Sequence, residues 1–294
     1  MKVLFCIFSY ATDLPLLRRN IDSIGRLKTL YPEHEILTAV VNDSNLPIAD
    51  EDMPSVDIVK TTSWKRGFNL TDLENIFGQL GMYSELSEET SADVVIKMDS
   101  DTMMSRLDWL DVFTGDNAPS IFGTCIYKTL NHICGYFYGM KPDVIAAMKQ
   151  LSEDESIAAR IMATREGWIL EDRIYTRLGQ MAHARRLCGA VRMERLDLKE
   201  YAQQFLSDTE QRAPMSGTQW IKEHGVPIDR YKNAIAVTFK RRGKTDDIVA
   251  EALEGMTAFW EVLKDAPRFK TAEETRTAQE AARRTEAETA VPAE

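Results

Sequence analysis

Two hydrophobic patterns alternate through the first third of the chain. Residues 2–9 form a continuous apolar run, which is typical of a strand covered on both faces of a sheet. The apolar positions that follow recur at steps of three and four and predict an amphipathic helix: Leu14, Leu17, Ile21, Ile24, Leu27 and Leu30. Further strands are predicted at residues 35–41, 56–61 and 92–98. A Thr71-x-x-Glu74 capping box marks a helix before the last of them. This order predicts an α/β fold with a Rossmann-like, mainly parallel sheet flanked by helices.

The rest of the chain is less regular and predicts a smaller, mixed C-terminal part. Strands are predicted at residues 120–127, 133–138, 187–193 and 234–239, and helices at 142–151, 169–183 and 246–263. The segment 271–294 has no aromatic residue and cannot bury enough surface to order itself, so it is either a flexible tail or a solvated helix of marginal stability. We therefore expect one domain over residues 1–265, with halves at 1–104 and 105–265, followed by a flexible charged tail over 266–294.

Charge and composition narrow the classes of partner. The 46 acidic residues outnumber the 36 basic ones, so the formal net charge is -10. This charge argues against a nucleic-acid partner. No apolar stretch reaches the roughly 18 residues of a membrane span, so no integral membrane segment is expected. Four scattered cysteines without a CxxC pair favour a reducing compartment, and we expect a cytoplasmic protein. The apolar start resembles a short signal peptide, but a buried first strand is the favoured interpretation.

Polar residues follow three of the predicted strands. Ser9-Tyr10, Asn42-Asp43 and Asp99-Ser100-Asp101 each stand where an apolar run ends. Ligands on parallel sheets bind beyond the carboxyl ends of the strands, so one shared cleft is expected there.

Asp99 and Asp101 are the strongest chemical signal in the sequence. The pair has no cationic neighbour in the sequence pattern, so we expect mutual repulsion that a divalent cation would relieve. Carboxylate oxygens suit Mg²⁺ or Mn²⁺, which also hold substrate phosphates. The alternative is a pair of solvated turn residues, because Asp and Ser favour turns.

In order and spacing, these motifs resemble the nucleotide-sugar glycosyltransferases of the GT-A fold over roughly residues 1–240. The resemblance implies a nucleotide-binding half over 1–104 and an acceptor half over 105–265. It implies a metal-dependent enzyme, with Mn²⁺ or Mg²⁺, that moves a sugar from a nucleotide-diphosphate donor to a hydroxyl acceptor on a glycan, a lipid-linked molecule or a protein. Asp101 would bind the metal, and Asp99 would bind the metal or the ribose. The nucleotide-binding set would also include Ser9, Tyr10, Asp43 and Ser100.

Two segments outside the strand ends extend the site in this resemblance. Lys65, Arg66 and Asn69 precede a capped helix and would meet the diphosphate, although a solvated loop gives the same pattern. His224 would be a third metal ligand, although a single loop histidine is more often exposed to solvent.

The acceptor half offers a glycine and an acidic pair. Gly139 follows three residues with two tyrosines and a phenylalanine and would let a sugar approach the backbone, or the segment is a packed strand. Glu171 and Asp172 stand at a helix start, which the helix dipole alone favours. The resemblance makes Asp172 the base of an inverting reaction, with Glu171 as the second candidate.

Two other functions fit the same residues. In a haloacid dehalogenase-like phosphatase, Asp99 would be the nucleophile and Asp101 the acid. Three predicted strands precede this pair, and Thr102-Met103 stands where that family has Gly-Thr, which argues against the phosphatase. A non-catalytic binding module on the same sheet is the third hypothesis.

Overall fold

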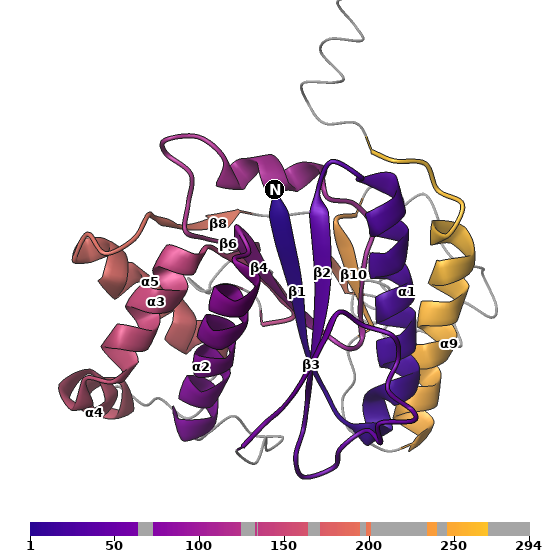
Figure 1. Ribbon diagram of the computed structural model, residues 1–294, viewed down its shortest axis with the longest axis horizontal. Helices are drawn as coiled ribbons and strands as arrows, with labels where there is room; N and C mark the ends of the chain where they lie inside the picture. The colour runs from indigo at the N-terminus through magenta and orange to yellow at the C-terminus, as the bar shows by residue number, and fades with distance from the viewer. Residues whose placement is uncertain are drawn as a thin grey trace, which may run out of the picture.

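The computed structural model describes residues 1–63, 73–124, 133, 135–163, 171–194, 198–200, 234–239 and 246–269. Its centre is a seven-stranded sheet in the order β3-β2-β1-β4-β7-β6-β8 (Figure 1). These strands are β1 (Lys2–Ser9), β2 (Glu35–Asn42), β3 (Ile58–Thr61), β4 (Val94–Asp99), β6 (Ile121–Thr124), β7 (Phe137–Met140) and β8 (Val191–Glu194). Only β7 runs antiparallel to its neighbours in this sheet, which confirms a mainly parallel sheet.

A small second sheet lies beyond the carboxyl end of β4. It joins β5 (Thr102–Met104), β10 (Ala236–Thr238) and β9 (Leu198–Glu200) in the order β5-β10-β9. Because β10 comes from the last part of the chain, this sheet ties the C-terminal part to the turn after β4. The smaller, mixed C-terminal part is therefore present, and it packs on the main sheet rather than standing apart.

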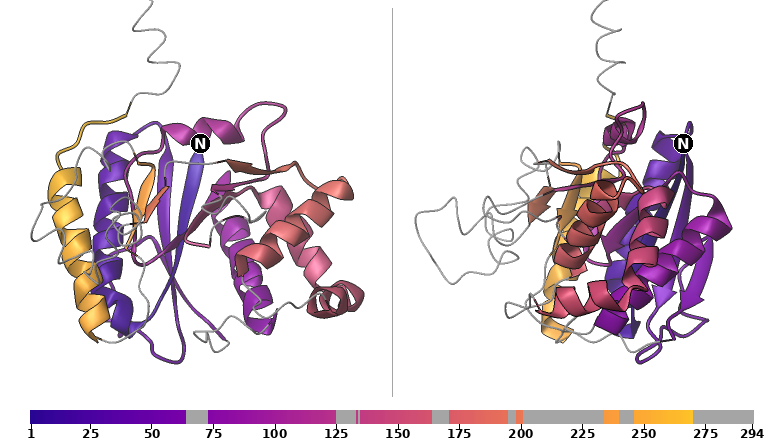
Figure 2. Two further views of the ribbon diagram at one scale, coloured as in Figure 1. Left: turned by 180° about the vertical axis from the view of Figure 1, so that it is seen from behind. Right: turned by 90° about the vertical axis from the view of Figure 1, so that its left-hand side faces the viewer.

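Helices cover both faces of the main sheet (Figures 1 and 2). One face carries α1 (Leu14–Leu30) with α9 (Asp246–Leu263) beside it, and the other carries α2 (Leu73–Thr90), α3 (Pro142–Ser152) and α5 (Glu171–Ala184). The shorter helices are η1 (Ala11–Asp13), η2 (Asp108–Phe113) and α4 (Glu155–Ala163).

The first strand shows why the sequence specifies this layering. Alternate residues of β1 enter two cores: Val3, Phe5 and Ile7 pack toward α1, while Leu4, Cys6 and Phe8 pack toward α2. All six side chains are buried, so the continuous apolar run serves both faces at once. None of the helices in the described ranges has the length and apolarity to cross a membrane.

The chain stays packed just past the predicted end of the domain. Residues 266–269 pack on the domain: Arg26 donates a 2.6 Å hydrogen bond to the Ala266 carbonyl, and Arg268 forms a 2.7 Å ion pair with Glu33. The domain boundary stays a prediction, and these contacts show that residues just after 265 pack against the domain. Composition alone does not reveal these contacts, because they are made by backbone and by single arginines. Residues 271–294, most of the predicted tail, lie outside the described part of the chain.

Candidate functional site

The predicted strand ends meet at one edge of the sheet. Ser9 is in register with Asn42, and Phe8 is in register with Asp99. The Asp43 amide donates a 2.9 Å hydrogen bond to the Ser9 carbonyl, which keeps the two chain segments together past the strands. The three strand ends therefore lie at one edge of the sheet, and the shared cleft expected there stays a prediction.

The nucleotide-pocket candidates at this edge are largely covered. Ser9, Tyr10 and Asp43 are all buried, with exposed fractions of 0%, 8% and 5%. Asp43 Oδ1 accepts a 2.8 Å hydrogen bond from the Asn45 amide and so shapes the turn after β2. These side chains form the floor of the edge, and their contact with a nucleotide stays a prediction.

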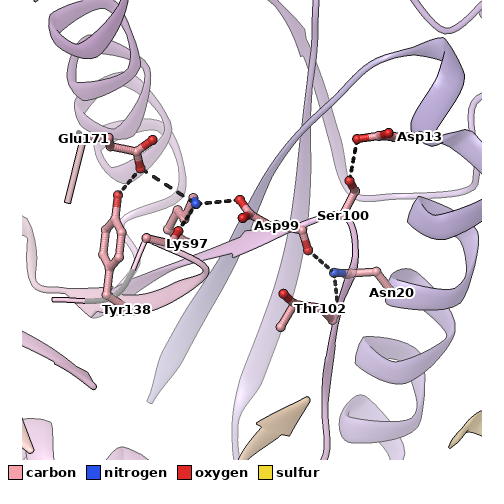
Figure 3. Close-up of polar contacts among 9 residues, drawn as sticks. Asp13, Asn20, Lys97, Asp99, Ser100, Thr102, Tyr138 and Glu171 are labelled. Carbon is pink, nitrogen blue, oxygen red and sulfur yellow. Dashed lines mark hydrogen bonds and ion pairs between the residues drawn. The ribbon is translucent and has the colours of Figure 1, made fainter. Parts of the chain in front are cut away.

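The turn after β4 is held from several sides (Figure 3). The Asn20 side chain in α1 donates hydrogen bonds to the carbonyls of Asp99 at 2.9 Å and Thr102 at 2.6 Å. Ser100 Oγ donates a 2.8 Å bond to Asp13 Oδ2. The carbonyl of Asp101 accepts a 2.8 Å bond from the Phe239 amide. Because these backbone groups are fixed, the two carboxylates stand on a rigid turn, and the Ser100 hydroxyl is used to build it.

Lys97 changes the electrostatic picture of Asp99. Its Nζ lies 2.6 Å from Asp99 Oδ1, and it also donates to the Gly135 carbonyl. The expectation that the carboxylate pair lacks a cationic neighbour is therefore wrong. Successive strand residues alternate between faces, so positions 97 and 99 share one face of β4. That spacing, with a lysine inside an apolar strand, is the signal that could have identified the pair.

The start of α5 meets the same lysine. Glu171 Oε1 is 3.8 Å from Lys97 Nζ and accepts a 2.6 Å hydrogen bond from the Tyr138 hydroxyl. Burial, followed by the charge of Glu171, raises the pKa of Tyr138 well above its ordinary value. The tyrosine therefore stays protonated and remains a donor. Glu171 is only 5% exposed and is held in the core by these contacts.

Asp172, the next residue, lies nearer the surface. Its side chain is partly exposed, and Oδ1 accepts a 2.7 Å hydrogen bond from the Arg173 amide. A methyl group on Gly135 would stand 3.5 Å from Asp172 Oδ2, so this carboxylate lies beside the segment whose carbonyl accepts from Lys97. The structure thus brings the acidic pair of α5 close to the end of β4, two features that the sequence treats separately.

Gly139 is enclosed on the side where a Cβ would stand. A Cβ at this position would lie 2.7 Å from Phe113 Cζ, so the ring of Phe113 fills the space that the glycine leaves. Gly139 is buried in β7, between β4 and β6. This packing favours the alternative of a packed strand, and a sugar contact at Gly139 stays a prediction.

Several predicted site residues lie outside the described part of the chain. These are Lys65, Arg66, Asn69 and His224. Their roles stay predictions from the sequence.

The oxygen ligands that this turn offers are of the type that Mg²⁺ and Mn²⁺ prefer. Asp99 and Asp101 offer carboxylate oxygens, and 32% of the Asp99 side chain is exposed, while Asp101 is 8% exposed. Within the described ranges, no three residues of the types His, Cys, Asp or Glu gather as a metal site. Mg²⁺ and Mn²⁺ commonly take one or two carboxylates and complete their shell with phosphate oxygens and water. The donor set therefore fits a metal that is shared with a phosphate-bearing ligand.

Comparisons with known proteins address the fold. Neither a scan against protein-family models nor a search of curated proteins finds a match. Among solved structures, an active-site mutant of LgtC is 11% identical and has a TM-score of 0.50 over 91% of this chain and 98% of that one. The chain has a GT-A fold. This confirms the predicted fold class, and at such low identity the likeness concerns the fold.

Two further structures match at similar coverage. Galactosyltransferase LgtC in complex with donor and acceptor sugar analogues is 10% identical, with a TM-score of 0.49 over 91% of this chain and 98% of that one. A glycosyltransferase involved in glycosylation of the major capsid of PBCV-1 is 8% identical, with a TM-score of 0.47 over 87% of this chain and 99% of that one.

Proposed function

We propose that this protein is a metal-dependent glycosyltransferase that moves a sugar from a nucleotide-diphosphate donor to a hydroxyl acceptor. The observation that carries the proposal is the rigid Asp99-Ser100-Asp101 turn at the carboxyl edge of a GT-A sheet, beside the acidic start of α5. In this proposal, the donor site would lie near the base at the start of α5.

Each carboxylate has a distinct task in this proposal. Asp101 and Asp99 would hold Mn²⁺ or Mg²⁺ together with the diphosphate oxygens. The ion, when bound, neutralises the charge that develops on the departing nucleotide diphosphate. Asp172 is proposed to take the proton from the acceptor hydroxyl. Glu171 is less suited to that task, because its Oε1 already accepts from Tyr138 and faces Lys97.

A thermal-shift screen tests the donor site. The full chain is heated with Mn²⁺ or Mg²⁺, with UDP, GDP and other nucleotides, and with both together. We expect stabilisation by one nucleotide only when metal is present. Turnover of a simple phosphoester without nucleotide would instead favour the phosphatase, and no response to either would favour the binding module.

Asp101→Ala tests the metal assignment directly. The substitution removes one of two carboxylates that would hold the ion, so metal-dependent nucleotide affinity should fall by about tenfold or more. Asp111→Ala is the matched control, because Asp111 is an exposed aspartate of η2. Isothermal titration with the nucleotide from the screen gives both affinities. Equal affinity in Asp101→Ala and in the unchanged protein would remove the metal assignment.

Inverting stereochemistry belongs to the same proposal and rests on the placement of Asp172. In an inverting reaction the base lies on the acceptor side of the anomeric carbon, and the product has the opposite anomeric configuration to the donor. Proton NMR of the first product formed reports that configuration. Retention would contradict the inverting assignment without touching the donor site.

A further inference from the structure

A buried lysine lies between the two acidic parts of the candidate site. Lys97 Nζ is 2.6 Å from Asp99 Oδ1 and 3.8 Å from Glu171 Oε1 (Figure 3). The side chains of Lys97 and Glu171 are 3% and 6% exposed, whereas 32% of the Asp99 side chain is exposed. One ammonium group is thus shared by a carboxylate in the core and a carboxylate that solvent reaches.

We propose that Lys97 is an internal counter-ion of Asp99 that makes the site select a metal–nucleotide diphosphate pair over the bare metal ion. The inference rests on the proposed function, because it gives Asp99 a role in metal binding. The ammonium beside Asp99 offsets part of the negative charge of the site. A free divalent cation therefore gains little there, whereas a cation accompanied by a diphosphate brings its own negative charge.

Two effects of Lys97 on metal binding have opposite signs. The hydrogen bond to Asp99 Oδ1 orients the carboxylate, which favours an ion, while the positive charge beside the same group repels it. The repulsion is the larger effect, because a divalent ion doubles it and the buried ammonium is poorly screened. Loss of orientation costs only the rotamer freedom of one short side chain. Removal of Lys97 should therefore strengthen the binding of Mn²⁺ alone.

The second partner of Lys97 explains why the lysine is tolerated inside the protein. Among the residues that the structure describes, Lys97 is the cation paired with both Asp99 and Glu171. Lys97→Met leaves the buried Glu171 carboxylate with the Tyr138 hydroxyl and without that cation, which destabilises the fold. Glu171→Gln removes the buried charge and keeps an oxygen acceptor for Tyr138. The double variant Lys97→Met/Glu171→Gln should therefore fold even where the single variant is unstable.

Titration of the full chain with Mn²⁺ alone, by calorimetry, tests the inference. Lys97→Met is compared with the unchanged protein, and Lys97→Met/Glu171→Gln is compared with Glu171→Gln. We expect Mn²⁺ to bind about tenfold or more tightly in each variant that lacks the lysine. Mn²⁺ should also raise the unfolding midpoint of Lys97→Met more than that of the unchanged protein.

Lys60→Met is the matched control. Lys60 in β3 is also a paired lysine, with ion pairs of 3.0 Å to Glu85 and 2.7 Å to Glu89 on α2. Its replacement should leave Mn²⁺ affinity unchanged. Affinity for Mn²⁺ that is equal or weaker without Lys97, in both comparisons, would overturn the inference.

The same titration with each nucleotide of the thermal-shift screen present separates this inference from the proposed function. If the unchanged protein binds none of these nucleotides with Mn²⁺, the proposed function fails and the inference falls with it. If it binds a nucleotide with Mn²⁺, but loss of Lys97 leaves the affinity for Mn²⁺ alone unchanged, only the inference fails.

Discussion

Asp172 and Asp154 are two aspartates at helix starts with different surroundings. Asp172 stands beside Gly135 at the candidate site, whereas Asp154 is exposed before α4 and its Oδ1 accepts from the Ser156 amide and hydroxyl. These hydrogen bonds lower the pKa of Asp154. They also show that Asp154 caps the start of α4. The pair therefore allows the chemical role proposed for Asp172 to be tested against the capping role of Asp154.

Asp172→Asn should lower kcat by about 10² to 10⁴, because an amide cannot take the proton from the hydroxyl of the acceptor substrate. Nucleotide affinity should stay within about twofold. Asp154→Asn should leave kcat unchanged, since it alters a distant cap. Both are measured with the donor nucleotide identified by thermal shift. Full activity of Asp172→Asn would assign the base to another residue.

Cys188 should react slowly with alkylating reagents. Burial, followed by the negative charge of Asp143, raises the pKa of its thiol from 9.0 to about 11. At neutral pH this difference reduces the thiolate by about a hundredfold, and the thiolate is the reactive form. Iodoacetamide labelling followed by mass spectrometry should show slow modification at pH 7.5 that accelerates as the pH rises toward 11. The urea-unfolded chain supplies the control, and equally fast labelling of the folded protein would contradict the raised pKa.

Single residues were predictable from sequence where their chemistry is local. Asp99 and Asp101 stand out because they follow an apolar strand, and their turn is where the pattern places it. Lys97 was missed, although its strand position gives it the same face as Asp99. Its contact with Glu171 could not be predicted, because the two residues are far apart in the chain and meet only through the packing of α5.

Strand β7 differs from its neighbours in direction and carries a tightly packed glycine. It pairs antiparallel with β4 and β6. The ring of Phe113 occupies the place of a Cβ on Gly139 and packs against Trp109 and Phe122. Because these rings are themselves enclosed, Phe113 has little freedom to move aside.

Gly139→Ala should destabilise the protein by about 1–3 kcal/mol, because an added methyl group overpacks this core. Gly81→Ala is the matched control, since a Cβ at that position in α2 meets nothing within 4 Å. Alanine is the better helix former, so the control should gain up to about 1 kcal/mol. Urea unfolding gives both free energies. A stable Gly139→Ala variant would show that the ring of Phe113 moves aside at little cost.

Single strands and helices could be predicted from the sequence more easily than the pairing of strands in the sheet. A continuous apolar run is enough to identify β1, and helical periodicity is enough to identify α1. The antiparallel insertion of β7 between β4 and β6 depends on long-range pairing. The alternation of strand and helix patterns therefore predicts the fold class. The strand order depends on long-range pairing, which local patterns do not contain.

Arg26 connects three distant parts of the molecule. Its guanidinium donates to the Ser105 carbonyl at 3.0 Å and to the Ala266 carbonyl at 2.6 Å, and the residue is 8% exposed. Burial lowers the pKa of Arg26 below its ordinary value, but the group stays charged at neutral pH. Since a buried charged donor needs its acceptors, the segment after α9 belongs to the stability of the domain.

A chain that ends at residue 269 should therefore be more stable than one that ends at residue 265. The shorter chain loses the Ala266 acceptor of Arg26 and the partly exposed pair of Arg268 with Glu33. The buried acceptor accounts for about 1–3 kcal/mol and the ion pair for at most about 1 kcal/mol. For a domain of this size, about 2 kcal/mol corresponds to roughly 4–8 °C in the unfolding midpoint.

Arg26→Met in both truncated chains shows whether the difference passes through the arginine. Without the guanidinium, no buried charged group depends on the Ala266 carbonyl as its acceptor. The difference in unfolding midpoint between the two chains should then shrink to the contribution of other contacts, such as the pair of Arg268 with Glu33. Differential scanning calorimetry on the four proteins completes this cycle. A difference in unfolding midpoint of the same size with and without Arg26 would assign the effect to other contacts of residues 266–269. Arg26 would then not be the group through which this segment stabilises the domain.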